Sequence, residues 1–287
     1  MPSYDVSGPI DLDVTAGVGF IEIVASDRTD AVIEVVPSKP GRSGDASLAR
    51  EATVSFDSGV VRVRVPRRLN LFGKSDSVDV RCAVPTGSRV TVETAYGSVR
   101  ARGVLGDCRI VAKYGGVTAD TVANLVLDAP YGSTDIAEVT GRLDVTAGHG
   151  ALRVAHVHGD ARLRASHATM ELGTVAGDVE VTTSGALTID RALGDVTARS
   201  AHGAIRIRET SGGVIRLDNG HADVDVGVPA GVAAWIDASS AHGRVRNELT
   251  PDPAAAASDQ TVELHLHANY GNVIIRRVTA PRTEAST

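Results

Sequence analysis

The residues with the most chemical potential in this sequence are tyrosines and histidines that recur at a nearly fixed spacing. An aromatic or imidazole residue followed by Gly or Ala returns every 17 to 21 residues, and Ser184-Gly185 fills the one vacant step. The positions are Tyr96, Tyr114, Tyr131, His149, His167, His202, His221 and His242. If each repeat is one layer of a stack of β-strands, equivalent residues lie about 4.8 Å apart. Neighbouring His149 and His167 can then offer two nitrogens to one metal ion or anion.

A structural role for this column competes with ligand binding. A ring with apolar faces and a polar edge suits a half-buried turn, and Tyr occupies the same place in several units. A zinc site normally has three or four ligands that include Cys or a carboxylate. We therefore predict that the eight residues form a stacked ladder, with no metal and no cofactor. Binding of a metal or small ligand by the His column remains an alternative hypothesis.

Carboxylate catalysis, as in β-helical enzymes that degrade polysaccharides, is a further alternative. The candidate carboxylates are Asp107, Asp160, Asp178, Asp190 and Asp195. They fall mostly at predicted turns, where Asp has a backbone role. Aromatic residues are 3% of the chain and Trp235 is its only Trp, so the platforms that a sugar-binding cleft uses are scarce. We predict no catalytic residues and no enzyme activity.

The segment from Pro66 to Ser75 is a candidate interaction loop, because it combines basic residues with large apolar ones. Its candidate residues are Arg67, Arg68, Leu69, Leu71 and Phe72. An exposed apolar cluster can anchor a protein partner or a second copy of the chain. The competing hypothesis is that the leucines and Phe72 fold back and plug one end of the stack.

The spacing of these residues predicts how the chain is built. A short fixed period means that each unit buries its apolar face only against its neighbours. Each unit contains two short segments of alternating apolar and polar residues, which indicates two strands. In the unit that begins at Tyr96 the predicted inward residues are Val99, Ala101, Val104, Cys108, Ile110 and Ala112. In the unit that begins at His149 they are Leu152, Val154, Val157, Ala161, Leu163 and Ala165. Arginines alternate with both sets and are expected to face solvent.

A second glycine recurs midway through each unit, usually as Gly-Asp. The pairs are Gly106-Asp107, Gly159-Asp160, Gly177-Asp178 and Gly194-Asp195. Gly and Asp tolerate positive φ, so we expect a tight corner with positive φ at these positions.

These patterns predict an all-β fold, a β-solenoid with almost no helix. We expect one domain over residues 1–277, with irregular coils and a cap in 1–95, regular coils and final strands in 96–277, and a disordered tail in 278–287. Strands are expected in GFIEIVAS, AVIEVVP, ATVSFD, VVRVRVP, SVDVRCAVP and RVTVETA, and a cap is needed because the end of a stack exposes an unpaired sheet edge.

Composition narrows the function classes. The 287 residues carry a net charge of −6, and the arginines are dispersed rather than clustered, so we predict no nucleic-acid binding. No stretch approaches the ~18 apolar residues of a transmembrane segment, and the first residues lack the pattern of a signal peptide. We therefore expect a cytoplasmic protein. Cys82 and Cys108 lie in apolar, strand-like contexts that favour buried thiols.

An ordered set of segments covers nearly the whole chain and carries a family resemblance. The segments are PRRLNLFGKSDSVDVRCAVPTG, the repeated units similar to AYGSVRARG, SSAHGRVRNELTPD and ANYGNVIIRR. Together they resemble a bacterial family of β-strand-repeat proteins of unknown function, many of them named putative adhesins. The resemblance implies a single-stranded parallel β-solenoid, a right-handed β-helix, and supplies no catalytic residues. We expect a non-enzymatic scaffold or protein-interaction module whose partner is another protein or a second copy of itself.

Overall fold

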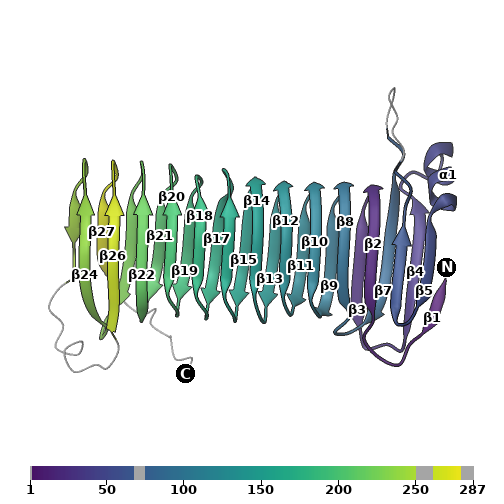
Figure 1. Ribbon diagram of the computed structural model, residues 1–287, viewed down its shortest axis with the longest axis horizontal. Helices are drawn as coiled ribbons and strands as arrows, with labels where there is room; N and C mark the ends of the chain where they lie inside the picture. The colour runs from purple at the N-terminus through teal and green to yellow at the C-terminus, as the bar shows by residue number, and fades with distance from the viewer. Residues whose placement is uncertain (1, 68–74, 250–260, 279–287) are drawn as a thin grey trace, which may run out of the picture. The chain divides into compact units, whose positions relative to one another are not determined.

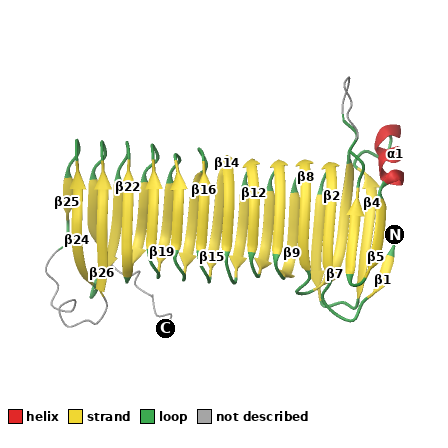
Figure 2. Cartoon of the chain, in the orientation of Figure 1, coloured by secondary structure: helices red, strands yellow, loops and turns green. Residues whose placement is uncertain are grey.

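The computed structural model describes residues 2–67, 75–249 and 261–278. The chain is all-β, as predicted, and in the described part the only helix is α1 (Ser43–Glu51), which is drawn in red in Figure 2. This helix is too short to cross a membrane. The chain divides into two compact units, Met1–Val154 and Ala155–Thr287. Strand β15 (Ala151–Val157) contains the boundary between them.

The first unit builds two sheets from strands that alternate between them (Figure 1). One sheet has the order β1-β4-β7-β3-β9-β11-β13 and the other has the order β5-β6-β2-β8-β10-β12-β14. From β8 to β14, strands that are two places apart in the chain pair in parallel. The bounds are β1 Ser3–Asp5, β2 Asp11–Val18, β3 Ile21–Ser26, β4 Asp30–Pro37, β5 Thr53–Asp57, β6 Val60–Arg64, β7 Val78–Pro85, β8 Arg89–Tyr96, β9 Val99–Leu105, β10 Cys108–Tyr114, β11 Val117–Val122, β12 Leu125–Tyr131, β13 Thr134–Val139 and β14 Leu143–His149. All six strands expected before Tyr96 are present, and β1 and β2 were not predicted.

The start of the first unit differs from the rest because its outer strands run antiparallel. Strand β1 pairs with β4, β4 with β7, and β5 with β6, all antiparallel. Helix α1 packs against β4 and β7 and falls in a segment that the sequence analysis treated as a connection. Nine residues without an apolar stripe give too little periodicity to predict a helix.

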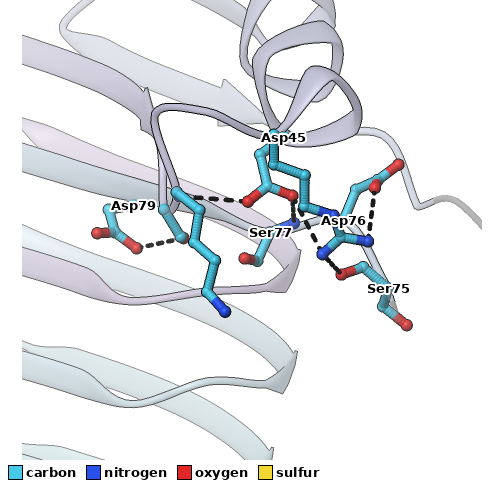
Figure 3. A network of polar contacts seen from close by, with 8 residues as sticks. Asp45, Ser75, Asp76, Ser77 and Asp79 are labelled. Atoms are coloured by element: carbon cyan, nitrogen blue, oxygen red, sulfur yellow. Dashed lines mark hydrogen bonds and ion pairs between the residues drawn. The ribbon is translucent and has the colours of Figure 1, made fainter. Parts of the chain in front are cut away.

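The buried carboxylate of Asp45 links α1 to neighbouring segments of the same polypeptide, as Figure 3 shows. Asp45 is fully buried and accepts hydrogen bonds from the amides of Lys39 at 3.2 Å and Ser77 at 3.0 Å. The guanidinium of Arg42 lies 3.5 Å from Asp45 and 3.2 Å from Asp76. Each oxygen of Asp45 therefore accepts a bond from a backbone amide, which offsets the cost of burying a charge.

The predicted inward register holds with two exceptions. Ile110 and Leu163 are each 1% exposed, whereas Val104 is 49% exposed and Leu105 takes its inward place. The prediction for Val104 was wrong because β9 contains an extra residue: the register against β11 shifts after Ala101, and Gly103 has φ +81°. A bulge of this kind reverses the alternation beyond it. Ala165 is only half-buried.

The second unit also forms two sheets. Their orders are β17-β19-β21-β23-β27-β25 and β16-β18-β20-β22-β26-β24, and all their described pairings are parallel. The bounds are β16 Ala161–Ala165, β17 Thr169–Val175, β18 Val179–Thr183, β19 Leu187–Ala192, β20 Val196–Ser200, β21 Ile205–Thr210, β22 Gly213–Asn219, β23 Val224–Pro229, β24 Ala233–Ser240, β25 Val245–Asn247, β26 Thr261–Ala268 and β27 Val273–Val278. The last two described strands, β26 and β27, insert before β24 and β25 instead of following them. Val278 ends β27, and the rest of the predicted tail lies outside the described residues.

The mid-unit Gly-Asp corners form for a reason other than the one expected. Gly106, Gly177 and Gly194 do not have positive φ. A Cβ on Gly194 would instead overlap the backbone of the preceding corner. Asp178 accepts a hydrogen bond from the amide of Asp195 at 3.0 Å, and Asp195 accepts one from Val214 at 2.8 Å. The glycines allow close approach between layers, and Asp160, Asp178 and Asp195 each accept a backbone amide of the next layer.

Candidate interaction surface

Four strands of one sheet in the first unit each end in a ring, and the rings stack. Tyr96 ends β8, Tyr114 ends β10, Tyr131 ends β12 and His149 ends β14, in matched register. The ring centroids are 4.9 Å apart for the first two pairs and 5.5 Å apart for the third, with interplanar angles of 6°, 4° and 11°. We call these four residues the aromatic column. The parallel strands hold the rings at their own spacing.

The glycine after each ring makes this spacing possible. A Cβ on Gly115 would overlap the carbonyl oxygen of Gly97, and Gly115 has φ +153°. Its amide donates to the carbonyl oxygen of Tyr131 at 3.0 Å. Only glycine allows the backbone of neighbouring layers to approach so closely at this corner.

The tyrosines of the aromatic column remain substantially open to solvent. Tyr96 is 53% exposed, Tyr114 46% and Tyr131 45%. Stacking covers the ring faces between neighbours, so the exposed surface consists mainly of ring edges and hydroxyl groups. The column therefore presents a continuous amphipathic ridge, apolar along its carbon edges and able to donate or accept hydrogen bonds at its hydroxyls.

The corresponding rings of the second unit are mostly imidazoles. The centroids of His202 and His221 are 4.9 Å apart and tilted by 49°, whereas Tyr270 stacks on His221 at 5.2 Å and on His242 at 4.6 Å, each at 15°. Sequence reasoning did not place Tyr270 in the column, since it required the insertion of β26 beside β24. His167 lies after β16 in this unit. Within the described ranges, no three His, Cys, Asp or Glu side chains are placed to hold a metal ion.

Buried polar side chains support this second row of rings. Asn219 is fully buried; its Nδ2 donates to the carbonyl of Gly203 at 2.7 Å, and its Oδ1 accepts the amides of His221 at 3.1 Å and Ala222 at 2.9 Å. Ser200 performs the same task one layer earlier: its Oγ donates to the carbonyl of Gly185 at 3.0 Å and accepts the Gly203 amide at 3.1 Å. These bonds satisfy the backbone where the chain turns between sheets.

Several charged side chains on the faces of the strands pair between neighbouring layers. Arg162 contacts Glu180 at 2.8 Å, and Asp225 bridges Arg206 at 3.1 Å and Arg276 at 2.8 Å. Further pairs are Arg191–Glu209, Arg208–Asp190, Arg102–Glu22 and Arg81–Glu34. Of the candidate carboxylates, Asp190 lies within β19 and not at a turn. Because exposed ion pairs contribute little to stability, these contacts mainly neutralise the faces locally.

The first unit also has a groove of about 580 Å³ on the outer side of β2, β6, β8, β10 and β12. Asp11 holds Arg89 through two bonds of 2.6 and 2.9 Å, and the hydrogen bond raises the pKa of Arg89. One lining row runs across adjacent strands from Arg62 through Asp13 and Thr91 to Arg109. The sequence analysis missed this groove because it needed the register of β2 and β6 against the regular layers.

A second polar cluster lies on β24 and β26 of the second unit. Trp235 is 57% exposed and its ring lies 5.1 Å from that of His265. His265 Nε2 lies 2.6 Å from a carboxylate oxygen of Glu263, and Ser239 Oγ lies 3.0 Å from Nδ1 of His267. The sequence analysis had assigned Trp235 no site.

The remaining candidates are placed as follows. Arg67 is exposed at the end of a described range, while Arg68, Leu69, Leu71 and Phe72 lie outside the described residues. Cys82 and Cys108 are unpaired and buried, and burial raises the pKa of each thiol to about 12. Protonated, buried thiols of this kind are poor nucleophiles.

Comparison with known proteins finds similarity only among solved structures. No family model and no curated protein sequence matches the chain. A putative adhesin from Parabacteroides merdae is 13% identical over 78% of this chain and 94% of its own, with a TM-score of 0.49. A putative cell adhesion protein from Clostridium sporogenes is 11% identical over 96% and 98%, with a TM-score of 0.24. A putative lipid binding protein from Parabacteroides distasonis is 12% identical over 96% and 95%, with a TM-score of 0.27. The first two names repeat the description carried by the sequence resemblance.

Proposed function

We propose that the chain is a non-enzymatic binding protein in which each unit is a parallel β-solenoid, and that the aromatic column of the first unit binds a protein partner. Support for the solenoid comes from the regular strands, β8–β14 in the first unit and β16–β23 in the second, which alternate between two sheets and whose described pairings two places apart are parallel. The observation that carries the binding role is the exposure of Tyr96, Tyr114 and Tyr131.

The distribution of aromatic residues supports this role. The chain has only five tyrosines, and four of them, Tyr96, Tyr114, Tyr131 and Tyr270, are about half exposed at 45–55%. Tyrosine is enriched in protein interfaces because it gives a large contact area with little loss of conformational entropy. The stack already immobilises three of these rings, so a partner pays little further ordering cost when it binds them.

The groove extends the proposed surface along the same strands. It is lined by the first halves of β8, β10 and β12, whose last residues are the tyrosines of the aromatic column. Its lining row includes Arg62 and Arg109, with Asp13 and Thr91 between them. A partner that places apolar side chains against the rings and carboxylates near these guanidinium groups would match both parts of the surface.

Site-specific photo-crosslinking tests the proposal. A benzophenone amino acid would replace Tyr114, and in a control protein it would replace Thr118, an exposed residue of β11 in the other sheet. We expect a discrete protein adduct from position 114 in extract of the native host. Unlabelled wild type should compete for that adduct, whereas an equally stable Tyr96→Ser/Tyr131→Ser variant should not. Equal adducts from both positions, or competition by the variant, would refute binding through the column.

A further inference from the structure

The last layer of the second unit ends in two strands with an unpaired outer edge. Strand β24 pairs with β26 and β25 pairs with β27, and in the described part of the chain no strand lies beyond either of them. The outermost strands of the first unit differ, since β1, β4 and β5 pair antiparallel there. An open edge of parallel strands is a template for pairing with another chain.

Core side chains at this edge are only partly covered. Ala234, Ile236 and Ala238 of β24 are half-buried, although their register partners in β26, Val262, Leu264 and Leu266, are at most 2% exposed. In the other sheet Val245 is 44% exposed while its partner Val273 is fully buried. The apolar interior therefore reaches the surface at the end of the stack.

The backbone of β24 points hydrogen-bonding groups away from β26. The amide of Val179 donates to the carbonyl oxygen of Asp195 in the following layer. In successive strands of this sheet, the register partners of Val179 are Val196, Ile215, Leu264 and finally Ile236. The amide of Ile236, and those of Ala234 and Ala238 by the alternation of the strand, therefore point outward. The same residues thus combine outward amides, which no described strand pairs, with partly covered apolar side chains.

We propose that this edge binds a second copy of the chain, through antiparallel pairing of β24 with β24 about a two-fold axis at Ile236. In this register Ile236 faces its own copy and Ala234 faces Ala238, so the two cores cover each other. Trp235 then lies opposite Asp237. Shifting the axis to Asp237 would place two like charges directly opposite one another, which is unfavourable. Two-fold pairing uses the same patch on both copies and closes the assembly at a dimer.

The size of the edge suits such a contact. Strand β24 has eight residues, about 26 Å in length, and two sheets ~10 Å apart with their outer side chains give a width of ~20 Å. Each copy would bury roughly 500 Å², so the total reaches the ~1,000 Å² expected of a specific interface. Trp235, exposed at its margin, is of the residue type most enriched among interface hot spots.

Sedimentation equilibrium in about 0.15 M salt, where charge repulsion is screened within ~8 Å, tests the proposal. The mass should rise with concentration from 29.7 kDa to twice that value. Ala238→Pro removes only an outward amide, and proline is tolerated on an edge strand. This variant should weaken dimerisation at least tenfold. Trp235→Ser should weaken dimerisation by at least the same factor. Thr118→Lys, an exposed change in the first unit, should leave the dimer unchanged.

Three outcomes of this experiment would contradict the proposed dimer. A monomer at all concentrations would overturn the proposal, and so would a dimer that both Ala238→Pro and Trp235→Ser leave intact. Growth beyond a dimer would exclude the two-fold arrangement. Thermal melting would show that each variant is folded. If the proline variant does not fold, Trp235→Ser still tests the proposal.

Spin labels at position 239 test the register. Cys82 and Cys108 are buried and their pKa values are raised to about 12. In a Ser239→Cys variant the spin label should therefore react with the thiol introduced at position 239. An axis at Ile236 separates the two Cα atoms of residue 239 by about 20 Å, and an axis at Asp237 by about 14 Å. A distance near the longer value supports the proposed dimer, and the shorter value overturns its register.

Discussion

Replacing Asn219 should show how much of the second unit depends on one buried amide. In Asn219→Ala the amides of His221 and Ala222 lose their acceptor and the carbonyl of Gly203 loses its donor. Each buried group left without a partner costs about 1–3 kcal/mol. Because the corner is partly open to water, we expect a loss of about 3–5 kcal/mol in the free energy of unfolding.

Asn219→Ser is the matched control. A serine can donate to one carbonyl and accept one amide, as Ser200 does in the preceding layer, so it should leave one amide unpaired and lose only about 1–2 kcal/mol. Urea denaturation would measure both variants. Hydrogen exchange should also speed up at His221 and Ala222 in the alanine variant. Equal losses in the two variants, or a loss below about 1 kcal/mol for alanine, would refute this account of the corner.

Three further predictions concern the core, the corner glycines and the thiols. Ile110→Asp should unfold the first unit cooperatively because an unpaired buried carboxylate costs several kcal/mol, whereas Arg102→Ala at an exposed ion pair should change stability by less than about 1 kcal/mol; thermal melts compare them. Gly115→Ala should cost more than about 2 kcal/mol, since its Cβ would overlap a backbone carbonyl at φ +153°, and a fully stable variant would contradict the stacked-layer geometry. Burial raises the pKa of Cys82 and Cys108 from 9.0 to about 12, so stability is present below pH ~9 and is lost as pH rises toward ~12, by about 3 kcal/mol for both thiols between pH 8 and 10. A Cys82→Ala/Cys108→Ala variant should lack that part of the pH dependence, and an identical pH profile for both proteins would be evidence against it.

Much of the fold was predictable because side-chain alternation reports directly which residues face the core. The buried positions of Ile110 and Leu163 followed from this pattern alone. Val104 did not, since one extra residue at Gly103 reverses the alternation and a bulge has no reliable mark in a single sequence. The insertion of β26 and β27 was also out of reach, because equivalent strands of a repeat have similar patterns and the sequence does not state which neighbour each one selects.

The candidate surface was less predictable. The recurring rings at Tyr96, Tyr114 and Tyr131 were visible in the sequence, but their exposure depends on the angle of the corner that carries them. The groove depends on strands far apart in the chain, since Arg62 and Arg109 share a row only after β6, β2, β8 and β10 are in register. Sequence periodicity is a local property, whereas a surface that crosses strands is set by pairing.

The insertion of the final strands has a consequence for synthesis on the ribosome. Strands β24 and β25 emerge before β26 and β27, yet their parallel partners in the finished fold are those later strands. Domains generally begin to fold from the N-terminal side during synthesis, but here the last layers must wait for translation to reach Val278. A chain that stops at Leu249 would lose β26 and β27 and would leave β24 and β25 without their partners, so the loss of two strands removes two layers of the stack.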